Sequence, residues 1–196
     1  MATYSLVHGA WHGGWAWDLV RTELEQRGHV VHTPDLPIED VDAGVEDYAA
    51  AVPPAGVVVG HSMAGLVIPH VEAAVHIYVC ALVGRRPADE GFARGFGDAR
   101  VRDALGRSYY PDPAAGAREL QYPPEYARLA VKLRRQATID GDGSIPAGRW
   151  TYVVCARDAC VSPDYQRRVA NNPVELDAGH SPMLECPREL ADILEA

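Results

Sequence analysis

The sequence predicts an α/β fold, with a mainly parallel sheet and helices on both of its faces. Short runs rich in β-branched residues alternate with segments whose apolar residues recur at helical spacing, which is the pattern of strand–helix–strand crossovers. The chain has 196 residues, 47% of them hydrophobic, and no internal repeat, so we expect one domain over residues 1–196. The predicted strands cover residues 4–7, 29–33, 57–59, 75–83, 151–155 and 174–176.

Cap residues mark the ends of the predicted helices. Gly28 follows the apolar face of the first helix, at the point where a left-handed C-terminal cap is expected. Ser162 and Pro163 have the form of an N-cap followed by a first-turn proline. The most apolar window, residues 65–84, is interrupted by prolines, histidines and a glutamate, so we interpret it as a buried helix that runs into a buried strand rather than as a membrane span.

The charge balance restricts the kinds of partner. A formal net charge of −9 repels phosphate backbones and anionic lipid surfaces, so neither nucleic acid nor a membrane is an expected partner. We expect a small-molecule substrate, and the sequence leaves open whether the chain forms a homo-oligomer. The first residues have no basic region before a long apolar stretch, so we expect a cytoplasmic location. The four cysteines form no Cys-x-x-Cys pair and are expected to be free and mostly buried.

One serine follows a predicted strand and precedes a helical stretch. The segment Gly60–Gly65 reads Gly-His-Ser-Met-Ala-Gly, directly after the valines of the strand at 57–59. In a nucleophile elbow the serine occupies a strained turn, and its neighbours two positions away must be small. Gly60 meets this requirement and Ala64 nearly does. Two other Gly-x-Ser sequences lack this context, so Ser62 is the predicted nucleophile.

A serine hydroxyl needs a base to remove its proton and an acid to orient that base. Asp158 lies just beyond the strand at 151–155, and His180 lies in the loop after the strand at 174–176. The carboxyl ends of parallel strands meet at one edge of a sheet, so Ser62, Asp158 and His180 can converge there in the chain order Ser, Asp, His. We predict these three residues as the catalytic set.

Acyl transfer also needs donors for the oxyanion. The glycine-rich loop after the first strand can present the backbone N–H of Ala10, and the N–H of Met63 would complete the pair. His8 and His12 are four residues apart, but the surrounding glycines argue against the helix that a zinc site with this spacing would need. We expect no metal and no cofactor, and we expect His12 to be a hydrogen-bonded anchor of the loop.

These motifs resemble the α/β-hydrolase fold, and in particular its methylesterase and hydroxynitrile-lyase-like branch. The resemblance rests on His-Gly-Ala-Trp-His-Gly-Gly-Trp, Gly-His-Ser-Met-Ala-Gly and Gly-His-Ser-Pro-Met-Leu-Glu, and it covers most of the chain. It implies Ser62 as nucleophile, His180 as general acid and base, Asp158 as orienting acid, and Ala10 and Met63 as oxyanion donors.

The sequence departs from this resemblance in two places. Hydroxynitrile lyases of the branch typically carry a lysine after the catalytic histidine, where this chain has Ser181, so cyanohydrin cleavage is disfavoured. The connection at 36–56 and the predicted cap excursion at about 84–124 look shorter than usual. The cap stretch is rich in glycine and proline, and its arginines could form an anion cradle, although the acids beside them favour solvated ion pairs. The seven arginines are Arg85, Arg86, Arg94, Arg100, Arg102, Arg107 and Arg118.

The predicted function is that of a cofactor-independent serine hydrolase of the esterase type. It would act on a small or medium carboxylic ester, or a related acyl compound, through an acyl-enzyme. One alternative is a lyase, eliminase or cyclase that uses His180 as a base without an acyl-enzyme. A third is a small-molecule receptor built on the same fold, because fold alone does not fix function.

Overall fold

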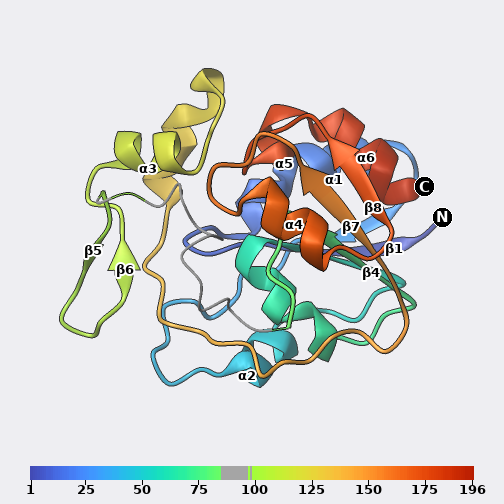
Figure 1. The fold of residues 1–196 in the computed structure, drawn as a ribbon, viewed down its shortest axis with the longest axis horizontal. Helices are drawn as coiled ribbons and strands as arrows, with labels where there is room; N and C mark the ends of the chain where they lie inside the picture. The colour runs from blue at the N-terminus through green and yellow to red at the C-terminus, as the bar shows by residue number, and fades with distance from the viewer. Residues whose placement is uncertain (85–96, 98) are drawn as a thin grey trace.

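The computed structural model of the chain describes residues 1–84, 97 and 99–196. Six parallel strands form one sheet in the order β2-β1-β3-β4-β7-β8 (Figure 1). Their bounds are β1 Thr3–Val7, β2 Val30–His32, β3 Val57–His61, β4 Val75–Val79, β7 Arg149–Cys155 and β8 Pro173–Leu176. The predicted α/β class and its parallel sheet are confirmed.

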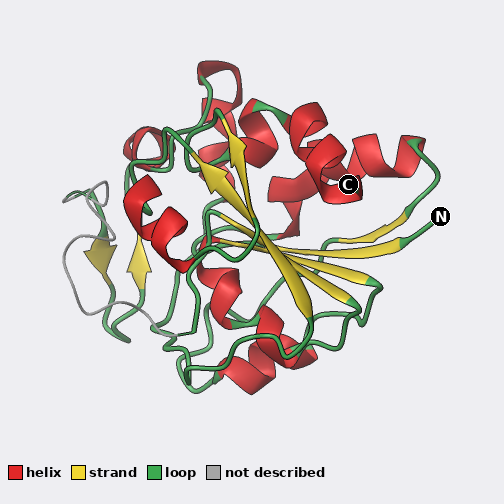
Figure 2. Ribbon diagram, turned by 45° about the vertical axis from the view of Figure 1, so that its right-hand side comes forward, coloured by secondary structure: helices red, strands yellow, loops and turns green. Residues whose placement is uncertain are grey.

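Helices cover both faces of this sheet (Figure 2). One face packs against α1, α5 and α6, and the other against α2, α4 and the 3₁₀ turns η2 and η3. The bounds are α1 Asp18–Gln26, α2 Val45–Ala50, α4 Pro163–Val169, α5 Pro182–Glu185, α6 Pro187–Glu195, η2 Ser62–Leu66 and η3 Ile68–His70. Because both faces are covered, neighbouring strand residues are buried in opposite directions: Leu6 packs with the first layer and Val7 with the second.

The remaining elements lie between β4 and β7 or beside the first loop. A two-stranded antiparallel ribbon and α3 stand at the end of the molecule opposite the two termini (Figure 1). These elements are β5 Val101–Arg102, β6 Ser108–Tyr109, α3 Pro113–Glu119, η5 Pro124–Lys132 and, after β1, η1 Gly14–Trp17. The ribbon and α3 belong to the cap stretch predicted at about 84–124. The description of residues 1–196 as one domain with this excursion stays a prediction.

Two of the predicted elements differ in the structure: one strand is shorter, and one helix is replaced by turns. The strand predicted at 75–83 stops at Val79, because Cys80 adopts a positive φ of 39° and Leu82 then donates its N–H to the carbonyl of Ser62 at 3.0 Å. The buried helix expected within 65–84 is replaced by the short turns η2 and η3. Pro69 has no N–H, so a continuous α-helix could not be hydrogen-bonded there.

The predicted helix ends are confirmed where caps mark them. Gly28 has a φ of +85°, and the next N–H, that of His29, reaches back to the carbonyl of Leu24 at 3.1 Å. Ser162 accepts a hydrogen bond from the N–H of Tyr165 at 3.2 Å and so caps α4. Among residues 1–84, 97 and 99–196, every helix is too short or too polar to cross a lipid bilayer.

Candidate active site

Ser62 occupies a strained turn at the carboxyl end of β3. Its φ is +54°, in the left-handed region that residues other than glycine rarely adopt. Two glycines make the turn sterically possible. A Cβ on Gly60 would lie 2.9 Å from Cγ2 of Ile68, and a Cβ on Gly65 would lie 2.0 Å from the carbonyl oxygen of Leu82. The predicted elbow is therefore present, and its tightest contact is at Gly65 rather than at Ala64, which is buried without such a clash.

Asp158 lies in the loop after β7, and four donors surround its buried carboxylate. Oδ1 accepts the backbone N–H groups of Cys160 at 2.7 Å and Val161 at 2.9 Å. Oδ2 accepts Nε2 of Gln166 at 3.0 Å and Nδ1 of His180 at 2.9 Å. These four hydrogen bonds fix the position and orientation of the carboxylate.

His180 follows β8, and its imidazole is almost completely buried. Asp158 fixes the ring in one orientation, since an ionised carboxylate can only accept and the hydrogen must therefore lie on Nδ1. The neutral ring then keeps a lone pair on Nε2, the form that a general base requires. Sequence reasoning placed Asp158 and His180 at adjacent strand ends, and the structure joins them by a direct hydrogen bond.

His61 connects the serine turn to the histidine loop. Its Nε2 donates to the carbonyl oxygen of His180 at 2.8 Å, and the two rings lie 4.8 Å apart. Burial, with a further contribution from the nearby His180, holds the pKa of His61 well below its usual range. A neutral His61 immediately before Ser62 therefore holds the backbone of His180 against the elbow.

The glycine-rich loop after β1 packs against Ser62. A Cβ on Gly9 would lie 3.0 Å from Cβ of Ser62, a tighter contact than side chains usually make, so glycine favours this approach. His12 donates from Nδ1 to the carbonyl of Ala10 at 2.7 Å and accepts the hydroxyl of Tyr122 at Nε2, also at 2.7 Å. Burial lowers the pKa of His12 to about 3, which keeps the ring neutral. The predicted anchoring role of His12 is confirmed.

A cavity of about 360 Å³ opens beside Ser62, within the size range of small-molecule sites. Ala10 and Met63, the predicted oxyanion donors, share its wall with the serine. Met63 lies in the first turn of η2, where backbone N–H groups have no partner within the helix. The buried Asp158 and His180 are not part of the cavity wall. The rest of the wall is mixed, and includes Leu66, Leu82, Ile139, Val161, Ser108, Gln136, Arg100 and Arg102.

The arginines of the cap stretch are partly paired with acids. Arg107 contacts Asp103 at 2.8 Å, and Arg118 lies 3.9 Å from Asp112. Arg100 stands over the ring of Trp11 at 5.0 Å and faces the carboxylate of Glu119 at 3.9 Å. The pair of Arg118 is exposed to solvent, as expected, whereas those of Arg100 and Arg107 are partly buried. Arg85, Arg86 and Arg94 lie outside the described residues.

Two buried groups of side chains have the donor types of a metal site. Within each group the possible ligand atoms lie within 4.8 Å of one another. One group is His61, Cys80 and His180, and the other is Asp158, Cys160 and His180. Hydrogen bonds already account for this closeness. His61 and Cys80 both donate to the carbonyl of His180, and Asp158 accepts from its ring. The expectation of an enzyme without metal or cofactor stays a prediction.

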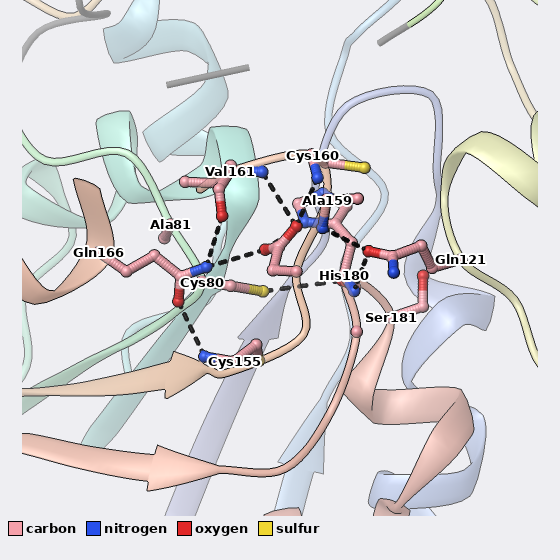
Figure 3. Close-up of polar contacts among 12 residues, drawn as sticks. Cys80, Ala81, Gln121, Cys155, Ala159, Cys160, Val161, Gln166, His180 and Ser181 are labelled. Carbon is pink, nitrogen blue, oxygen red and sulfur yellow. Dashed lines mark hydrogen bonds and ion pairs between the residues drawn. The ribbon is translucent and has the colours of Figure 1, made fainter. Parts of the chain in front are cut away.

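Sequence reasoning missed three residues that hold this site together. They are His61, Gln121 and Gln166. His61 could have been noticed, because it stands next to the predicted nucleophile. Gln166 is fully buried and joins Asp158 to the backbone of Cys155 and Val161. No sequence pattern marks either glutamine, since Gln166 reaches the site from α4 and Gln121 from the turn after α3 (Figure 3).

The position after His180 has a structural partner. The side chain of Ser181 is fully buried and donates to the carbonyl of Leu120 at 2.6 Å. It thus joins the histidine loop to the cap stretch. The departure noted at this position, a serine in place of lysine, is therefore accommodated by a backbone hydrogen bond.

Comparison with known proteins identifies similar sequences and folds. A model of the alpha/beta hydrolase family matches residues 6–193. Methylesterase 7 of Arabidopsis thaliana is 25% identical over 246 aligned positions, which cover 97% of this chain and 94% of the relative. An alignment of this length on 196 residues leaves at least 50 positions without a counterpart here. That shortfall agrees with the expectation of shortened connections.

Solved structures show the same fold at lower identity. Polyneuridine aldehyde esterase superimposes with a TM-score of 0.74 at 20% identity, covering 98% of this chain and 97% of the other. A methylesterase from Arabidopsis also gives 0.74 at 20% identity, covering 100% and 98%. At this identity the likeness establishes the arrangement of the backbone.

Proposed function

Because the chain belongs to the α/β hydrolase family, we propose that it is a cofactor-independent serine esterase for small or medium carboxylic esters. Family membership confirms the predicted resemblance, and the relatives named above are esterases, which supports an enzyme of this type. Two observations carry the proposal together: the buried hydrogen bond between Asp158 and His180, and the strained turn that places Ser62 at the wall of a cavity. His61, the residue before the serine, donates to the carbonyl of His180 and so ties the two together.

In this mechanism Ser62 is the nucleophile. Nε2 of His180 takes the proton of the hydroxyl while Oγ attacks the ester carbonyl. The imidazolium that forms is stabilised by Asp158, whose other oxygen is held by the N–H groups of Cys160 and Val161. His180 then gives the proton to the leaving alcohol, and an acyl group stays on Ser62.

The second half of the reaction uses the same groups. His180 removes a proton from water, the hydroxide attacks the acyl carbonyl, and the carboxylic acid leaves as the proton returns to Ser62. In both halves the backbone N–H groups of Ala10 and Met63 stabilise the oxyanion. The bond between His12 and the carbonyl of Ala10 supports this role by fixing the loop in place.

The cavity indicates the size of the substrate rather than its identity. A volume of about 360 Å³ suits an ester with a small acid or a small alcohol. Since several relatives are named methylesterases, methyl esters of small carboxylic acids are the first substrates to examine.

The test combines active-site labelling with a panel of esters. A fluorophosphonate probe should modify Ser62 in the folded protein, and Ser62→Ala should lose both labelling and at least about 10³-fold in kcat. Asp158→Asn should retain the fold and lose about 10³- to 10⁴-fold in kcat. Full turnover by Ser62→Ala would contradict the proposal, as would a product that takes up no oxygen from labelled water.

A further inference from the structure

We propose that Gln121 is a positioning residue that holds the acid and histidine loops at their working distance. This inference rests on the proposed esterase function, because it concerns the geometry of Asp158 and His180. Gln121 lies just after α3, in the cap stretch, and its φ of +55° is one that residues other than glycine rarely adopt. Such a conformation persists only where surrounding contacts determine it.

The side-chain amide of Gln121 makes three hydrogen bonds to two loops. Its Oε1 accepts the backbone N–H of Ala159 at 2.8 Å and that of His180 at 3.0 Å. Its Nε2 donates to the carbonyl of Arg157 at 3.0 Å. In Figure 3, Gln121 approaches from the side opposite to Gln166. One amide thus joins the loop after β7 to the loop after β8.

These partners are the immediate neighbours of the proposed acid and the backbone of the proposed base. Arg157 and Ala159 flank Asp158 in the chain, so fixing both of them fixes the carboxylate between them. The third bond goes to His180 itself. The spacing between Asp158 and His180 therefore depends on Gln121 as well as on their direct hydrogen bond, and an error of about 1 Å in such spacing can cost about 100-fold in rate.

The residues around Gln121 pack closely against its side chain. A Cβ on Gly179 would come within 3.1 Å of Nε2 of Gln121, so the glycine before His180 leaves the room that the amide needs. The two preceding residues are bonded to the same loops. The carbonyl of Glu119 accepts Sγ of Cys160 at 3.0 Å, and that of Leu120 accepts the hydroxyl of Ser181 at 2.6 Å. Gln121 is the member of this segment that reaches both loops.

The decisive variant is Gln121→Asn. Asparagine keeps the amide and favours a positive φ, but its shorter side chain cannot reach both loops. We expect kcat to fall about tenfold or more, with KM changed less than about twofold, because the substrate cavity does not include Gln121. The control is Tyr110→Phe, which removes a cap hydrogen bond to Glu119 of 3.0 Å. It should leave kcat unchanged.

A readout that needs no turnover separates this inference from the proposed function. The proton shared by Nδ1 of His180 and Asp158 should give a far-downfield proton NMR signal. We expect it to shift or broaden in Gln121→Asn and to stay in place in Tyr110→Phe. If the wild-type protein hydrolyses no ester, the function fails, and this signal alone decides the role of Gln121.

A second variant covers the case in which Gln121→Asn does not fold. Gln121→Glu keeps the accepting oxygen and places a negative charge beside the histidine loop. It should raise the pH of the acidic limb in the pH profile of kcat/KM. A folded Gln121→Asn with wild-type kcat, pH profile and NMR signal would overturn the inference, and so would a Gln121→Glu profile that does not move.

Discussion

Gly65 shapes the serine turn because no other residue can sit so close to the chain after β4. A methyl group there would lie 2.0 Å from the carbonyl oxygen of Leu82. Leu82 in turn donates its N–H to the carbonyl of Ser62. The obstacle is backbone, so it cannot rotate away as a side chain could. We expect Gly65→Ala to lower the free energy of unfolding by about 3 kcal/mol and to reduce esterase activity, since Ser62 must move with its turn.

The control for this variant is Gly148→Ala. A Cβ on Gly148 meets no described atom within 4 Å, so the substitution should change the free energy of unfolding by less than about 0.5 kcal/mol. Urea unfolding of both variants measures the difference. Equal stabilities for Gly65→Ala and Gly148→Ala would mean that the turn tolerates a side chain that the structure excludes.

At the level of elements, one cap segment contacts the three loops that form the site. The segment at 119–122 bonds to the loops after β1, β7 and β8, so it acts as a common support for them. Tyr122 provides the link to the first loop. We expect Tyr122→Phe to leave Nε2 of the buried His12 without a donor and to lower the free energy of unfolding by about 2 kcal/mol. A looser Ala10 should also lower kcat.

Tyr126→Phe is the matched control for that change. Tyr126 lies in η5, four residues further along. Within residues 1–84, 97 and 99–196, its hydroxyl has no hydrogen-bond partner. Thermal unfolding and ester hydrolysis should be nearly unchanged in this variant. A Tyr122→Phe protein as stable and active as Tyr126→Phe would show that the link between Tyr122 and His12 has no effect.

Buried histidines make the whole molecule sensitive to acid. Burial lowers the pKa of His8 to about 4 and that of His12 to about 3, and it holds the pKa of His61 well below its usual range. In the unfolded chain each would titrate at about 6.5. Below that pH the unfolded state binds more protons than the folded state, so the free energy of unfolding falls as the pH falls.

The expected loss is largest between about pH 6.5 and 4. Each histidine contributes about 1.4 kcal/mol per pH unit once its unfolded form is protonated, and three together contribute about 4 kcal/mol per unit. Urea unfolding at pH 7.5, 6.0 and 5.0 measures this slope. Carboxylates ordinarily titrate at lower pH, so a flat stability from pH 7.5 to 5.0 would contradict neutral burial of these rings.

The sequence was sufficient for the features that depend on neighbouring residues. The alternation of strands and helices, the cap at Gly28 and the elbow at Ser62 follow from short-range patterns of apolar, small and capping residues. Even there, local pattern has limits. The strand predicted at 75–83 ended at Val79 because its last residues turn towards Ser62, a contact between segments about twenty residues apart.

Sequence alone therefore determined the fold class, the family resemblance and the candidates Ser62, Asp158 and His180. The packing of distant segments decided how those candidates are held. Gln121 and Gln166 reach the site from elements that no local pattern connects with it, and His61 acts through the backbone of a residue 119 positions away. The physical reason is that a periodic pattern reports which face of an element is buried, whereas a hydrogen bond between loops exists only after the sheet has brought their strand ends together.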